Sequence, residues 1–150
     1  MQALHIHLIL SHAPTVIILL GSGLLVVGVL RRSEDLKRGA LGVFVSAALV
    51  AFPVYLTGEP SADSVKGLPA ISDRVLDQHQ AVAALALASG VLLGILSGVG
   101  FFLFRGAKAV AGWFTAILLG ASLLAGGFLG WTANLGGQIR HSEIRSDEIK

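Results

Sequence analysis

Histidine is the side chain in this sequence best suited to chemistry, because an imidazole can carry a proton or bind a metal near neutral pH. The chain has five histidines. His5, His7 and His12 lie near the N-terminus, His79 opens a long apolar segment, and His141 follows another. All five therefore border apolar segments. They are the candidate site, and the rest of the chain has to position them.

The elements that position them are long and apolar. The chain of 150 residues is 54% hydrophobic and 13% charged, with a mean hydropathy of +0.79. Four long stretches contain no Asp, Glu, Lys or Arg: residues 3–30, 39–58, 78–104 and 109–139. About 20 apolar residues suffice for a helix to cross a bilayer, and lipid requires each span to satisfy its own backbone hydrogen bonds. The sequence therefore predicts an all-α membrane protein, a single domain over residues 1–150 that forms an up-down four-helix transmembrane bundle.

The predicted boundaries follow from charge and capping signals. Ser11 is a candidate N-cap with Pro14 in the first turn, and Ser72 is a candidate N-cap outside the bilayer. Pro53 is expected to kink the end of the second span. We expect spans at about residues 11–30, 39–57, 78–104 and 109–136, an outer loop at 59–77 and a charged tail at 142–150.

Basic residues predict the orientation. The connections at residues 31–38 and 105–108 are short and hold six of the eleven Lys and Arg residues. Short basic loops stay in the cytoplasm. This pattern favours a multi-pass protein of a bacterial inner (cytoplasmic) membrane with both termini in the periplasm, so that all five histidines lie near the periplasmic face.

Residue spacing indicates which faces the helices share. His12, Val16, Leu19 and Gly23 form one stripe of a helix, and His7 lies off that stripe. In the third span, glycines recur every four residues and let another helix approach closely; they are Gly90, Gly94 and Gly98.

The leading functional hypothesis is a b-type haem. His12 and His79 begin the first and third spans, which are usually diagonal in an up-down bundle, so two imidazoles can ligate one iron across the axis. Donors or cations are expected at the haem propionates; the candidates are Arg74, Gln138 and Arg140. Room for the macrocycle is expected at small residues: Ala83, Ala86, Gly126, Gly127 and Gly130. This site predicts a membrane electron-transfer protein rather than a stand-alone enzyme.

Two other occupants of the same end stay open. Copper or zinc binds imidazole nitrogen and carboxylate oxygen, and the candidate ligands are His5, His7, His12, His79, His141 and Glu59. A quinone pocket is the third hypothesis, with a histidine and Glu59 accepting protons and Tyr55 shaping the cavity.

The structural interpretation is that histidines at helix ends serve as interfacial or capping residues. The competing class is then a cofactor-free accessory subunit of a larger respiratory or photosynthetic membrane complex, which binds through its glycine-rich faces. The chain has no cysteine, so thiolate chemistry and Cys-ligated clusters are excluded. No nucleic-acid patch, phosphate-binding glycine loop or intramembrane carboxylate pair is present in the sequence. A periplasmic electron carrier is a further candidate partner.

Three short segments carry a resemblance to a family. Ser11-His12-Ala13-Pro14, residues 53–60 and residues 136–141 resemble segments of an uncharacterised family of small four-span bacterial inner-membrane proteins. The resemblance implies a bacterial source and a four-helix membrane fold, and it carries over no established activity. Proteins of this kind occur beside respiratory components, and this association favours an electron-transfer function.

Overall fold

The protein is entirely helical over the part of the chain that its computed structural model describes, which is residues 2–69, 71–106 and 108–141. Four helical segments are long and apolar enough to cross a membrane. The first is divided into two helices and the others are continuous: α1 (Gln2–Leu10), α2 (Ala13–Leu30), α3 (Glu34–Asp63), α4 (Asp73–Leu103) and α5 (Gly112–Arg140). The predicted all-α fold with four membrane-length helices is confirmed.

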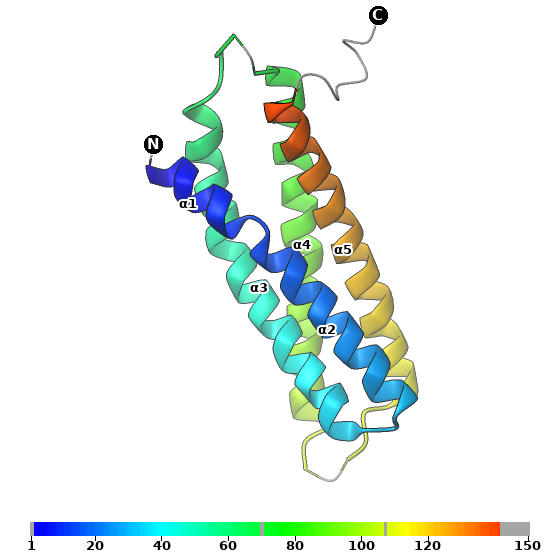
Figure 1. The fold of residues 1–150 in the computed structure, drawn as a ribbon. Coiled ribbons are helices and arrows are strands. Elements are labelled where there is room, and N and C mark those ends of the chain that lie inside the picture. The colour runs from blue at the N-terminus through cyan, green and yellow to red at the C-terminus, as the bar shows by residue number, and fades with distance from the viewer. Residues whose placement is uncertain (1, 70, 107, 142–150) are drawn as a thin grey trace, which may run out of the picture.

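The helices form a closed ring in chain order (Figure 1). Consecutive helices pack against each other from α2 to α5, and α5 returns to pack against α2. Helices α2 and α4 are therefore diagonal, as are α3 and α5. We call the end that holds α1, the α3–α4 connection and the last turns of α5 the histidine end. The opposite end, which holds residues 31–33 and the α4–α5 connection, is the loop end.

The first span is longer than predicted and is broken. α1 precedes the expected start at residue 11, and a turn at Ser11 and His12 separates it from α2. The N-cap of α2 is His12 rather than Ser11, and it forms no side-chain cap bond. The Ser11 hydroxyl instead donates to the Leu8 carbonyl, 3.0 Å away. Because of this turn, α1 crosses over α3 (Figure 1).

The second and third spans also extend beyond the expected boundaries. α3 continues through Pro53 and Pro60 to Asp63, so the connection to α4 is shorter than the predicted loop 59–77. The predicted cap at Ser72 is confirmed, because its hydroxyl accepts from the Val75 N–H. α5 runs several residues past the predicted end at 136.

Small residues allow close packing inside the ring. A Cβ built on Gly94 would lie 2.4 Å from the Cβ of Ala48, so α3 and α4 touch where only a glycine fits. Gly90 and Gly98 meet no such neighbour, so one glycine of the predicted series forms the contact. Large apolar side chains such as Leu123 face outward. This distribution suits a protein in lipid, where outward apolar surface costs nothing.

Charged side chains fasten the loop end. The Glu34 carboxylate accepts from the Val110 N–H at 2.7 Å and pairs with Lys37 at 2.7 Å. The Arg38 guanidinium donates to the carbonyls of Gly106 and Lys108 at 2.5 and 2.9 Å. These groups tie the start of α3 to the α4–α5 connection.

Candidate functional site

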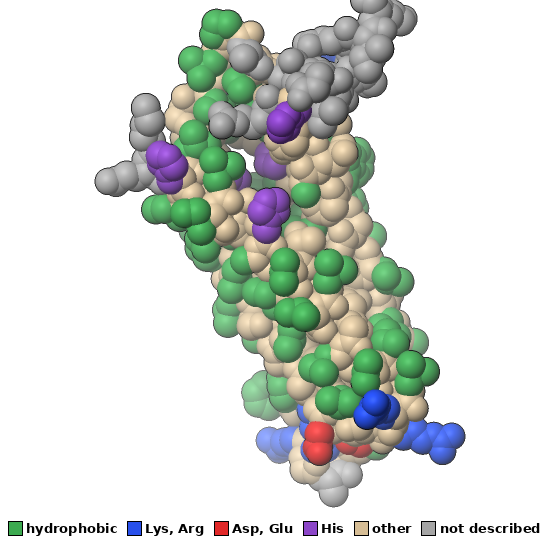
Figure 2. Space-filling model, viewed as in Figure 1, with side chains coloured by type: hydrophobic (Ala, Val, Ile, Leu, Met, Phe, Trp, Pro, Cys, Tyr) green, Lys and Arg blue, Asp and Glu red, His purple; other side chains and the backbone are tan. Residues whose placement is uncertain are grey.

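The histidines gather at one end of the bundle. In Figure 2 the purple histidine side chains occupy the upper part of the molecule, and the blue Lys and Arg side chains gather at the loop end. The same view shows a hollow on the upper face at which histidine side chains are visible. The candidate site is therefore built at the histidine end, and its geometry depends on which way each ring points.

His79 is held by the neighbouring helix. Its Nδ1 lies 2.9 Å from the carbonyl oxygen of Thr132 in α5. A carbonyl oxygen can only accept, so Nδ1 carries the proton and donates. In the neutral ring, Nε2 then keeps a lone pair that can bind a metal. Within the described residues the structure shows no hydrogen bond to that Nε2.

The surroundings of His79 are apolar on one side. The ring belongs to the α4 turns that also carry Val75 and Val82, which form a buried cluster with Leu135 of α5. Phe128 and Ile139 pack against this cluster. The imidazole therefore lies beside a dry surface, which strengthens the interaction between a metal and its ligand nitrogen.

His7 is held in the same manner on the other side of the bundle. Its Nδ1 lies 3.0 Å from the carbonyl oxygen of Val54 in α3 and 3.3 Å from the hydroxyl of Thr57. The Thr57 hydroxyl donates to the same Val54 carbonyl at 2.9 Å, so it accepts from the ring. Nδ1 is again the donor.

The two rings rest in equivalent notches. In each case a glycine lies four residues after the carbonyl that accepts the bond: Gly58 after Val54, and Gly136 after Thr132. A helical side chain covers the turn that precedes it, so a larger residue there would shield the carbonyl. A Cβ on Gly58 or Gly136 would lie 3.5 or 3.4 Å from the Cε1 of the docked ring. Because both residues are glycines, no side chain at these positions covers the accepting carbonyl or the Cε1 edge of the imidazole.

His12 lies differently. The stripe predicted from its spacing faces outward, since His12 is exposed and Val16 and Leu19 are 52% and 63% exposed. The stripe that faces the bundle contains Pro14, Ile18 and other buried residues. The structure does not bring His12 to His79, because the turn at residues 11–12 leaves His12 on the outer side of α2. Its role as a ligand stays a prediction from the sequence.

The other candidate metal ligands are dispersed. His5, Glu59 and His141 are exposed, and His141 serves as the C-cap of α5. No group of three or more His, Asp or Glu side chains within the described residues is placed to hold a metal ion. Tyr55, expected to shape a quinone cavity, is also exposed.

The candidate propionate partners lie around the same end. Arg74 is exposed in the first turn of α4, before His79 in the chain. Gln138 donates from its side-chain amide to the Asn134 side-chain oxygen at 2.7 Å. Arg140 ends α5, and its side chain lies outside the described part of the structure.

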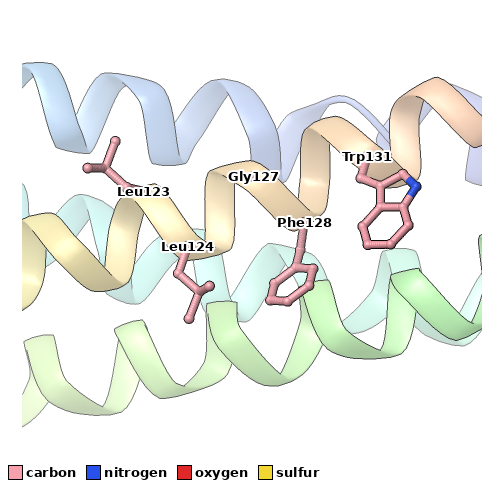
Figure 3. A pocket seen from close by; sticks show the side chains of 5 residues that line it. All are labelled: Leu123, Leu124, Gly127, Phe128 and Trp131. Atoms are coloured by element: carbon pink, nitrogen blue, oxygen red, sulfur yellow. The ribbon is translucent and has the colours of Figure 1, made fainter.

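An apolar groove of about 250 Å³ lies on the surface of α5 (Figure 3). Its lining comes entirely from α5: Leu123, Leu124, Gly127, Phe128 and Trp131. Gly127 and Gly130, which were expected to make room for a macrocycle, are exposed on α5, and Gly127 lines this groove instead. No imidazole lines it, so the groove offers a metal no ligand.

Sequence reasoning missed the roles of Val54, Thr132 and the two notch glycines, and it placed His7 off the relevant stripe. A signal for the inward face of α2 was present. His7, Pro14, Gly21 and Gly28 recur every seven residues, and the last three are all buried. A heptad spacing keeps residues on one helix face, so Pro14, Gly21 and Gly28 mark the inward face of α2, whereas His12 lies off that face. His7 precedes Pro14 by seven residues but belongs to α1, beyond the turn at Ser11 and His12.

Comparisons with protein families, with curated proteins and with solved structures find no significant match to this chain.

Proposed function

We propose that the protein is an integral membrane electron-transfer protein that binds a b-type haem at the histidine end. His79 is one iron ligand, and a histidine of the first span supplies the other. The observation that carries the proposal is the bond from Nδ1 of His79 to the Thr132 carbonyl, which keeps the proton on Nδ1 and leaves the lone pair on Nε2. Metal-binding histidines are oriented by bonds of this kind. A bound haem would supply a one-electron iron couple.

The residues at this end fit such a group. Two neutral imidazoles on different spans would hold such a group without a cluster of three ligands. Gly58 and Gly136 leave the ring edges uncovered. The apolar cluster of Val75, Val82 and Leu135 gives one side of the site a low dielectric. Arg74, Gln138 and Arg140 are the proposed partners of the propionates.

The chain's own residues would hold this site rigid. The Thr132 carbonyl keeps the proton of His79 on Nδ1, so no tautomer change is needed when Nε2 binds iron. The bond also fixes the ring against rotation, because α4 and α5 pack together along their length. A ring held in this way would suit a group that only gains and loses an electron.

We propose that the histidine end faces the periplasm of a bacterial inner membrane. The support is the charge distribution: the loop end carries Arg31, Arg32, Arg105 and Lys108 beside short connections. A periplasmic carrier or another subunit of a respiratory or photosynthetic complex would then be the redox partner. Reporter fusions at both termini test the orientation, with periplasmic activity expected at each. Cytoplasmic activity at both would reverse it.

The visible spectrum of the detergent-purified protein tests the haem. We expect a Soret band and a sharp reduced α band after expression with haem supply or after addition of hemin. His79→Ala should lose both bands. His5→Ala and His141→Ala are matched controls, because they remove exposed histidines of the same end, and both should keep the spectrum.

A helical, monodisperse protein that stays colourless and takes up no hemin would overturn the proposal. Metal analysis of that sample would then test copper and zinc. Co-purification with stoichiometric subunits would favour the accessory-subunit alternative.

A further inference from the structure

We infer that the second imidazole of the site is His7, presented by α1 where it folds back over α3, and that His12 is not a ligand. This inference rests on the proposed haem site and names the partner of His79. It follows from the way each ring is docked, from the depth of each histidine in the bundle and from the direction of the α2 stripe.

The first support is the matched docking of the two rings. His7 and His79 each donate from Nδ1 to a helix carbonyl with a glycine four residues further on. The Val54 and Thr132 carbonyls lie inside continuous helices, where each already accepts a backbone bond. The imidazole bond is therefore not needed to give either carbonyl a hydrogen-bond partner. Its consequence is to aim the ring, and it leaves Nε2 of each ring as the uncommitted nitrogen.

The second support is depth. Gly58 faces His7, Gly21 faces Phe44, and Gly94 faces Ala48. Counted along the antiparallel helices from these contacts, His7 lies level with about Ala84 of α4, and His12 level with about Ser89. At ~1.5 Å per residue, His7 is then about 7 Å from the level of His79, and His12 is about 15 Å away. Only His7 is near the depth at which both rings can reach one iron.

The third support is direction. His12 is exposed on the same stripe as Val16 and Leu19, so a ligand bound by His12 would lie outside the ring of helices. His7 is half-buried, and its ring is bonded to the Val54 carbonyl of α3. The turn at residues 11–12 produces this difference, because it lets α1 leave the direction of α2 and pack on α3.

The inference assigns α1 a task. α1 contacts α3, and the side chains of residues 4–10 are not part of the main buried core, which lies among the four longer helices. Under this inference α1 carries an axial ligand, and the Gly58 notch sets its position. Gly58 is then a positioning residue that acts through His7.

The test is the ligation state of the haem-loaded protein, read by visible absorption and electron paramagnetic resonance. Wild type should be six-coordinate and low-spin. His7→Ala should retain haem through His79 but become high-spin, and added imidazole should restore the low-spin spectrum. His12→Ala should stay low-spin. His79→Ala should lose most of the bound haem.

A second variant guards against a folding defect. The amide of His7→Gln can donate to the Val54 carbonyl and keep α1 docked, yet it does not ligate iron in this way; it should be high-spin as well. A low-spin spectrum in both His7 variants, with high-spin haem in His12→Ala, would overturn the inference and leave the haem site standing. Absence of haem from the wild type would instead refute the proposed function.

Discussion

The two ends of the bundle both use polar side chains, but they use them on different partners. At the loop end, Glu34 and Arg38 bind backbone groups of the α4–α5 connection, which have no helical partner. At the histidine end, His7 and His79 bind carbonyls that are already bonded within α3 and α5. A buried backbone group without a partner is costly, and Val110 is 3% exposed, so the Glu34 bond stabilises the fold. The imidazole bonds have no such cost to offset, and their effect is to orient a ring.

The largest effect on stability should therefore come from the loop end. Arg38→Met keeps the aliphatic stem but removes the donor to the Gly106 and Lys108 carbonyls. We expect a loss of about 1–3 kcal/mol in the free energy of unfolding, as is typical for bonds to a charged group. Denaturation of the detergent-solubilised protein, followed by circular dichroism, measures it.

The control at this end is Arg31→Met, since Arg31 is exposed in the α2–α3 connection at the same end of the bundle. It should change the unfolding free energy by less than about 0.5 kcal/mol. Both variants should leave the haem spectrum unchanged. Equal losses in the two, or a spectral change in Arg38→Met, would contradict the division between the ends.

Closing a histidine notch should affect the ligand more than the fold. In Gly136→Val the new methyl groups would cover the Thr132 carbonyl and press on the Cε1 edge of His79, where even a Cβ reaches contact. We expect haem affinity to fall about tenfold or more, equivalent to ~1.4 kcal/mol. A hemin titration of the purified protein gives the dissociation constant.

Gly130→Val provides the comparison, because Gly130 lies in the same helix and its Cβ would meet open space. The two variants carry the same change in helix propensity. Their difference in affinity isolates the contact with His79. If both bind hemin as the wild type does, the notch does not position the ring.

The sequence predicts the positions of the helices better than it predicts the orientation of the histidine rings. Segment lengths and charges suffice for four spans, because lipid leaves the backbone few alternatives. The facing of a stripe is harder, since both sides of these helices are apolar and hydrophobic periodicity carries little information. Hydrophobicity alone therefore does not show which of His12 and His7 faces the bundle. The inward face of α2 is marked only by Pro14, Gly21 and Gly28, because small residues pack inward in membranes.

The notches were beyond sequence reasoning for another reason. Gly58 and Gly136 gain their meaning from a histidine on a different helix, and that pairing depends on the register between helices and on the turn at Ser11 and His12. Local signals did locate the cap at Ser72, because a cap involves neighbours in the chain. The reliability of a prediction therefore fell with the sequence separation of the groups involved.

Removing the imidazoles from the haem-free protein should cost less than removing the loop-end bonds. Interhelical hydrogen bonds in membrane proteins contribute ~0.6 kcal/mol on average. We expect losses of about this size in the unfolding free energy of His7→Ala and of His79→Ala. His5→Ala, which removes an exposed ring of the same helix as His7, should have no measurable effect. A loss above about 2 kcal/mol in either docked-ring variant would show that the ring holds the fold together, contrary to an orienting role.

The smallest expected loss in unfolding free energy comes from removing a helix cap, and it should be the same at both ends. Ser33 caps α3 at the loop end and Ser72 caps α4 at the histidine end, and their hydroxyls accept from the N–H groups of Leu36 and Val75 at 3.4 and 3.5 Å. Both bonds satisfy orphan donors of a helix start. Because they are long, we expect Ser33→Ala and Ser72→Ala to lose about 0.5 kcal/mol each, the lower limit for a lost cap. The same denaturation measurement compares them directly.

Equal small losses would show that a hydrogen bond to a free backbone N–H contributes similarly to stability at the two ends, so that the difference between the ends is due to the imidazoles. A much larger loss for Ser72→Ala would mean that the start of α4, and with it the position of His79, depends on its cap rather than on the packing of α4 against α5.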